Sequence, residues 1–144
     1  MHIRIRQVAD LLAEYAYPQP FHLFLKEYFR KHKQAGSTDR REITNLCYRL
    51  FRTGSSLQML PFDERLMAAQ FLCADEKDIF YQKFVADNGL VNKAYTIGQR
   101  ISFLQKMHPT FLLENVFPYN QYLNSILKND VYFESFFEQP YTWI

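Results

Sequence analysis

Large apolar side chains recur every three to four residues along most of this chain, which is the spacing of one face of an α-helix. In residues 3–16 the pattern is carried by Ile5, Val8, Leu12 and Tyr15. No segment of useful length alternates apolar and polar residues as a half-buried strand would. The sequence therefore predicts an all-α protein, a compact bundle of about six to eight helices.

Prolines and glycines divide the periodic segments from one another. Pro18 and Pro20 end the first helix, Gly36 separates the second from the third, Gly54 ends the third, and Pro109 ends the sixth. Helices are predicted over residues 3–16, 20–33, 38–53, 61–74, 75–88 and 93–107, followed by two shorter ones near 119–128 and 130–137.

The composition agrees with a single helical domain. A chain of 144 residues can bury one core, and 14 Phe and 10 Tyr against 4 Gly supply bulky side chains between helices but few tight turns. The N-terminal segment carries charges among its apolar residues, unlike a signal peptide, and no uncharged stretch approaches the roughly 20 apolar residues of a spanning helix. We expect a cytoplasmic protein without a membrane partner.

The charge is unevenly divided along the chain. Residues 1–52 contain ten Lys and Arg against five Asp and Glu, whereas residues 53–144 contain seven against ten. Such asymmetry predicts one basic and one acidic face, and an acidic partner such as nucleic acid is its usual reason, although solubility alone can also produce it.

Two predicted helices carry cations on the side away from their apolar face. On the second helix Lys26, Arg30 and Lys33 repeat at i, i+4 and i+7. On the third helix the polar side carries cations, an amide and a phenol, which suit phosphates, base edges and unpaired bases. These residues are Arg41, Asn45, Tyr48, Arg49 and Arg52. The eight residues form the candidate RNA-binding site, and the alternative is that they are ordinary solvated helix faces. Arg40 lies nearer the apolar edge, where we expect it to pair with a carboxylate.

No catalytic or metal site is expected in this chain. The four histidines are scattered without the spacing of metal ligands, and Asp75, Glu76 and Asp78 are placed as helix caps. Cys47 and Cys73 lie in apolar helical patterns and are expected to be buried, reduced thiols. The chain also has no glycine-rich phosphate or cofactor loop.

Several short motifs are similar to those of a known enzyme family. The run from Ser37 to Ile43, followed by Tyr48, Arg49 and Arg52, resembles the "DRR … Y … R" helix of RsmB-type (Sun/Fmu) RNA cytosine methyltransferases. Phe117-Pro118 with Leu123 resembles that family's "FP … L" segment, and residues 139–144 resemble the start of its next domain. The resemblance implies a NusB-like helical RNA-binding domain over residues 1–138 and the beginning of a linker over 139–144.

The resemblance also implies what such a domain would serve. In that family a Rossmann-like catalytic domain, absent from this chain, uses S-adenosylmethionine to methylate C5 of cytosine. The expected partners are RNA, in particular ribosomal RNA, and the catalytic domain in cis. Two other functions stay open: a NusB-like protein-interaction or antitermination module, and a structural domain that packs on the catalytic one without touching RNA.

Overall fold

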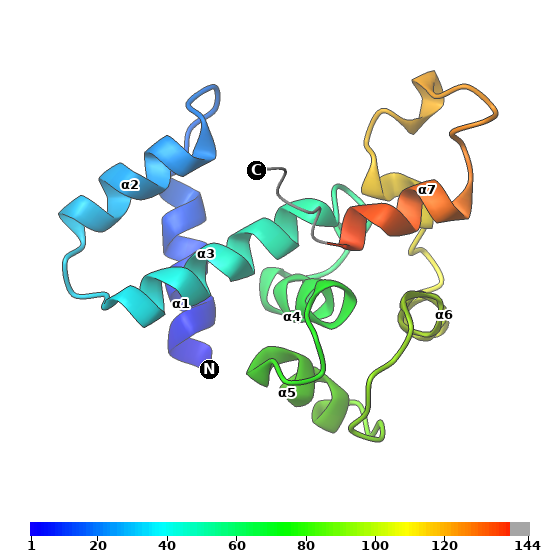
Figure 1. Cartoon of the computed structure of the whole chain (residues 1–144), viewed down its shortest axis with the longest axis horizontal. Coiled ribbons are helices and arrows are strands. Elements are labelled where there is room, and N and C mark those ends of the chain that lie inside the picture. The colour runs from blue at the N-terminus through cyan, green and yellow to red at the C-terminus, as the bar shows by residue number, and fades with distance from the viewer. Residues whose placement is uncertain (139–144) are drawn as a thin grey trace, which may run out of the picture. The chain divides into compact units, whose positions relative to one another are not determined.

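The computed structural model describes residues 1–138, and every regular element in that range is helical (Figure 1). The α-helices are α1 (His2–Glu14), α2 (Phe21–Lys31), α3 (Ser37–Arg52), α4 (Phe62–Cys73), α5 (Ile79–Asp87), α6 (Ile97–Met107) and α7 (Asp130–Glu134). Short 3₁₀ turns are η1 (Leu113–Val116), η2 (Asn120–Tyr122) and η3 (Ser135–Phe137). The prediction of an all-α protein with six to eight helices is confirmed, and the linker predicted over residues 139–144 lies outside the described residues.

The contacts within the chain group into two units. Unit 1 is Met1–Tyr48, and unit 2 begins at Arg49, so the boundary falls inside α3. With 16 residues, α3 is long enough to give its first turns to one unit and its last turn to the other.

Unit 1 buries one face of each of its three helices. Tyr15, at the end of α1, contacts the rings of Phe21 and Phe24 in α2, with centroids 5.0 and 5.2 Å apart. The buried side chains of this unit are Val8, Leu11, Phe24, Leu25, Phe29, Ile43, Leu46 and Cys47. Of the stripe predicted for α1 only Val8 is buried, since Ile5, Leu12 and Tyr15 are half-buried and Leu11 is the second buried residue of that helix.

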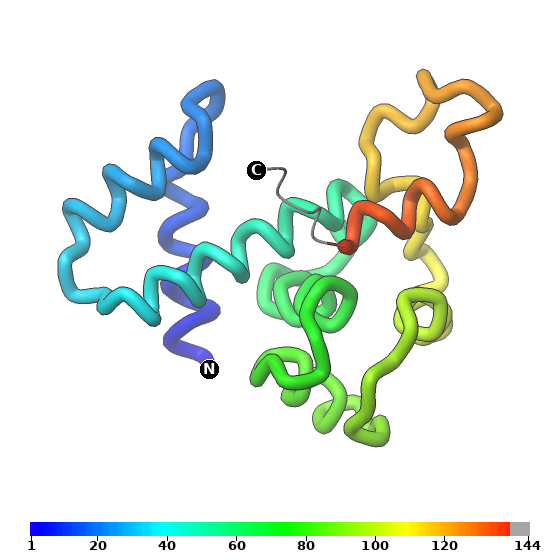
Figure 2. The backbone as a smooth tube through the Cα atoms, viewed as in Figure 1, coloured from blue at the N-terminus to red at the C-terminus, as the bar shows by residue number. Residues whose placement is uncertain are grey.

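Unit 2 is organised around α4, on which both α5 and α6 pack (Figure 2). Six consecutive or near-consecutive residues of α4 are buried: Leu66, Ala68, Ala69, Gln70, Phe71 and Leu72. Phe71 stacks on Phe84 of α5 with ring centroids 4.5 Å apart. A helix covered on several sides needs apolar residues around most of its circumference, which explains why α4 lacks a clear polar face.

Two helices start later than their apolar periodicity predicts, each at a side-chain cap. The α5 helix begins at Ile79 and not at Asp75, because the Asp78 carboxylate accepts hydrogen bonds from the backbone N–H groups of Phe80 and Tyr81. The α6 helix begins at Ile97 and not at Lys93, because Thr96 forms a capping box with Gln99. The helix predicted near residues 119–128 is reduced to η2 and turns.

None of the helices within residues 1–138 has the length and apolar character that crossing a bilayer requires.

Gly54 allows the chain that follows α3 to pack closely against the backbone of Asn115 and Val116 in unit 2. Its φ of 53° lies in the left-handed region, and a Cβ placed there would overlap the carbonyl oxygen of Val116. The next residue, Ser55, donates from both its backbone N–H and its hydroxyl to the carbonyl of Asn115. Only glycine satisfies the backbone conformation and the close approach together.

We predict that Gly54→Ala lowers the free energy of unfolding by about 2–5 kcal/mol, combining left-handed backbone strain with overpacking. Gly98 of α6 is the matched control, since a Cβ there meets nothing within 4 Å and its φ is not positive. Gly98→Ala should raise stability by up to about 1 kcal/mol. Urea unfolding followed by circular dichroism measures both, and equal effects of the two substitutions would contradict the role given to Gly54.

Candidate nucleic-acid interface

The cations of α2 lie on the side of the helix away from its buried residues. Lys26 and Arg30 are exposed, one turn apart, whereas Phe24, Leu25 and Phe29 are buried. Lys33 is also exposed, but α2 ends at Lys31 with His32 as its C-cap, so Lys33 follows the helix. The predicted i, i+4, i+7 ridge is therefore two helical cations and a third in the following turn.

The first turns of α3 also carry exposed polar side chains. Arg41 and Asn45 are exposed one turn apart and lie opposite the buried Ile43, Leu46 and Cys47. These positions agree with the helical spacing from which the residues were predicted to form a site.

Tyr48 lies at the contact between α2 and α3. Its ring meets Phe21 edge to face with centroids 5.5 Å apart, and 37% of the residue stays exposed. Unit 1 thus presents a partly exposed phenol on the same helix as Arg41 and Asn45.

Carboxylates close in sequence to these cations are already bound elsewhere in unit 1. Arg4 of α1 contacts Asp39 through Nη2 and Glu42 through Nε, each at 2.6 Å. Glu27 on α2 accepts a hydrogen bond of 3.4 Å from the Gln19 amide. We call Lys26, Arg30, Lys33 and Arg41 the unit 1 cations. None of these four side chains forms an ion pair within residues 1–138.

Arg40 lies outside this set, as the sequence predicts, but for a different reason. Its Nε donates to the carbonyl of Ala35 at 2.8 Å, and its guanidinium lies 5.8 Å from the centroid of the Phe29 ring. The prediction of a carboxylate partner is not met within the described residues. The carbonyl and the ring hold this cation at the end of the α2–α3 turn.

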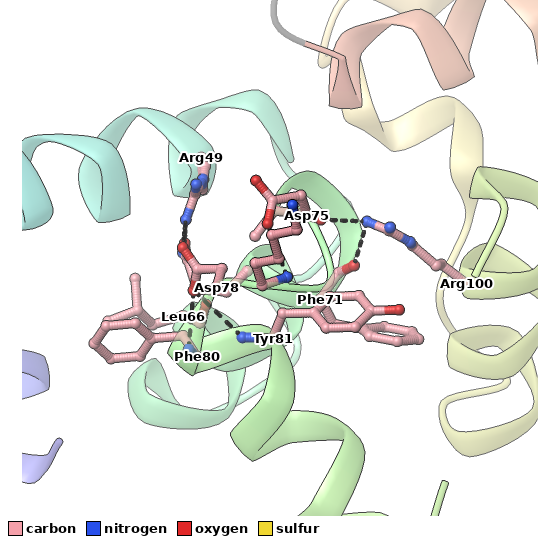
Figure 3. A network of polar contacts seen from close by, with 11 residues as sticks. Arg49, Leu66, Phe71, Asp75, Asp78, Phe80, Tyr81 and Arg100 are labelled. Atoms are coloured by element: carbon pink, nitrogen blue, oxygen red, sulfur yellow. Dashed lines mark hydrogen bonds and ion pairs between the residues drawn. The ribbon is translucent and has the colours of Figure 1, made fainter. Parts of the chain in front are cut away.

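Arg49 is held inside unit 2, as Figure 3 shows. Its Nη1 contacts Asp78 at 2.7 Å and the Gln70 amide oxygen at 3.2 Å, and only 18% of its side chain is exposed. Because Asp78 also caps α5, this pair fixes the last turn of α3 to the start of α5. Arg49 is therefore engaged, although it stands in the predicted site. Arg52, also in unit 2, is half-buried.

Arg100 has a structural role that sequence reasoning missed. It is 7% exposed and donates to the carbonyls of Phe71, Leu72 and Ala74 at the end of α4, and its guanidinium lies 4.8 Å from the Tyr81 ring centroid (Figure 3). A cation at a helix C-terminus satisfies carbonyls that have no partner within the helix. No signal in the sequence separates this arginine from an exposed one.

Neither thiol is suited to nucleophilic chemistry. Burial raises the pKa of Cys47 to about 12. Burial also raises the pKa of Cys73 to about 12, although Arg52, Arg49 and Arg100 oppose the shift. Both side chains stay protonated at neutral pH, whereas attack requires the thiolate. Groups of three or more His, Cys, Asp or Glu side chains that could hold a metal do not occur among residues 1–138.

Comparison of the chain with protein-family models, with curated proteins and with solved structures gives no match. The likeness to RsmB-type methyltransferases stays a prediction from its short motifs.

On α3, Arg49 is held by Asp78 whereas Arg41 is exposed, and unfolding measurements can test this difference. Arg49→Gln should lower the free energy of unfolding by about 1–3 kcal/mol, because Asp78 loses its charged partner in a half-buried position. Arg41→Gln, at an exposed position, should change it by less than about 0.5 kcal/mol. Thermal and urea unfolding measure both variants, and a larger loss for Arg41→Gln would overturn the distinction.

Proposed function

We propose that this chain binds RNA through the exposed cations of unit 1. The observation that carries the proposal is that Lys26, Arg30, Lys33 and Arg41 are exposed while the acidic side chains near Arg41 are bound to Arg4. Phosphate neutralisation by such cations releases counterions and supplies most of the affinity of sequence-independent binding. Four cations of unit 1 are thus exposed where a polyanion can reach them.

Asn45 and Tyr48 favour RNA over a simple inorganic anion. They lie on the helix of Arg41, and an amide can hydrogen-bond a base edge while a phenol can stack on an unpaired base. A surface that combines cations with these groups suits a folded RNA with accessible bases. Arg49 is left out of the proposed contact because Asp78 and Gln70 hold it.

The resemblance to RsmB-type enzymes suggests which process the proposed RNA binding serves. On that basis we place the chain as the domain that docks ribosomal RNA for a cytosine-C5 methyltransferase. Its catalytic domain, joined in cis and using S-adenosylmethionine, is not part of this chain. The proposal assigns no catalytic residue and no cofactor contact to residues 1–138. It rests on the short motifs around Asp39, Phe117 and Pro118 together with the unit 1 cations.

Salt-dependent RNA binding tests the proposal. For a fluorescein-labelled RNA stem-loop followed by anisotropy, Lys26→Gln with Arg30→Gln should weaken binding and lower the log–log salt slope by about 1.4–1.8. Arg41→Gln should lower the slope by about 0.7–0.9, since each lost phosphate contact removes that amount.

The matched control is Lys77→Gln with Lys128→Gln, which removes the same charge from exposed positions of unit 2. Its slope and affinity should equal those of the unaltered protein. The same loss in the two double variants would mean that only net charge matters, and this result would contradict a site on unit 1.

A protein partner is a second candidate function, and exposed apolar side chains in unit 2 favour it. Tyr119, Tyr122, Ile126 and Val131 are 63%, 78%, 80% and 77% exposed. Phe133, in the same part of the chain, is buried in α7. Apolar side chains that gather in a short exposed segment are typical of interaction surfaces. No measurable RNA binding by the unaltered protein, with a protein partner from lysate that is retained after nuclease treatment, would favour this candidate.

A further inference from the structure

A groove with a volume of about 490 Å³ lies in unit 1 on a different set of side chains from the proposed RNA contact. One wall is formed by α1 and the other by α2 and the turn after it, and Ile43 of α3 contributes to the lining. None of the unit 1 cations lines this groove. Its chemistry is acidic and aromatic in a unit that is otherwise basic.

The α1 wall carries two carboxylates, of which only Glu14 has a basic side chain within 4 Å among the described residues, that of His32. Asp10 and Glu14 are one helical turn apart, so they project from the same side of α1. Glu14 approaches His32 at 3.8 Å, which is longer than a hydrogen bond, and Asp10 forms no ion pair with any described residue. Two like charges at this spacing repel one another unless a cation lies between them.

The α2 wall presents aromatic rings to the same space. Tyr28 and His32 are also one turn apart, and their rings stack with centroids 4.1 Å apart and planes 25° apart. Burial, and then the charges of Glu14 and Asp10, raise the pKa of the Tyr28 hydroxyl. The phenol therefore stays neutral at neutral pH, and Tyr28, Asp10 and Glu14 all line the groove. A neutral ring near carboxylates attracts a cation through its π-face.

We propose that this groove binds an organic cation that carries an ammonium or guanidinium group. Asp10 and Glu14 would pair with the charge, and the Tyr28 ring would contact it from the opposite wall. A bare metal ion fits less well, because groups of three or more metal-ligating side chains do not occur among the described residues.

Two sources can supply this chemistry: a free polyamine, or a Lys or Arg side chain of a protein. The inference goes beyond RNA binding and does not depend on it, since the carboxylate wall would repel phosphate. Its test contains no RNA, so its failure and the failure of the proposed function are distinguishable.

Titration of the full chain with spermidine and, separately, with argininamide whose α-amino group is acetylated tests the groove by NMR. We expect saturable shifts of the Tyr28 and His32 ring signals with at least one of the two cations. Citrulline amide acetylated at the same amine matches this argininamide in shape but has no charge, so it should cause no saturable shift. Asp10→Asn with Glu14→Gln should weaken binding by about tenfold, the effect of losing two exposed ion pairs.

The control variant is Asp63→Asn with Glu64→Gln, which removes the same charge from exposed positions in the first turn of α4. It should leave the affinity unchanged. Binding of argininamide alone identifies a protein side chain as the occupant, and binding of spermidine alone identifies a polyamine. The proposal is overturned if neither cation binds, if citrulline amide binds equally, or if both variants weaken binding to the same extent.

Discussion

The arrangement of unit 1 depends on Arg4, the guanidinium that joins α1 to the first turns of α3. It contacts Asp39 and Glu42 at 2.6 Å each, and its own side chain is only 20% exposed. The two contacts fix the register between the helices and neutralise the acidic residues nearest to Arg41. If these carboxylates were free, their negative charge would offset part of the positive field of the exposed cations. The same interaction thus supports the packing of unit 1 and keeps its outer charge positive.

The role of each arginine depends on the carboxylate or carbonyl groups that it contacts. Asp78 binds Arg49 and fixes α3 to α5, so this cation stabilises unit 2. The carbonyls at the end of α4 hold Arg100, and the Ala35 carbonyl holds Arg40. Arg41 is left exposed with Lys26 and Arg30. Local pairing therefore decides which cations can meet RNA, and net charge alone does not.

Helical periodicity was enough to predict the fold class and the outward direction of Lys26, Arg30, Arg41 and Asn45, because these depend on spacing within one helix. It could not predict contacts between residues far apart in the chain. Arg49 shares the polar half of α3, but its partner Asp78 is 29 residues away. The start of α5 differs from the predicted one for a local reason. The cap Asp78 determines where this helix begins, and the spacing of apolar residues does not reveal a cap.

Protection of individual lysines by bound RNA is the most direct measurement of the central claim. Acetylation of the free and RNA-bound protein, read by mass spectrometry, reports each side chain separately. The account predicts that RNA protects Lys26 and Lys33 while Lys77, Lys106 and Lys128 of unit 2 stay equally reactive in both states. Protection of the unit 2 lysines alone, or equal reactivity of every lysine with and without RNA, would contradict it.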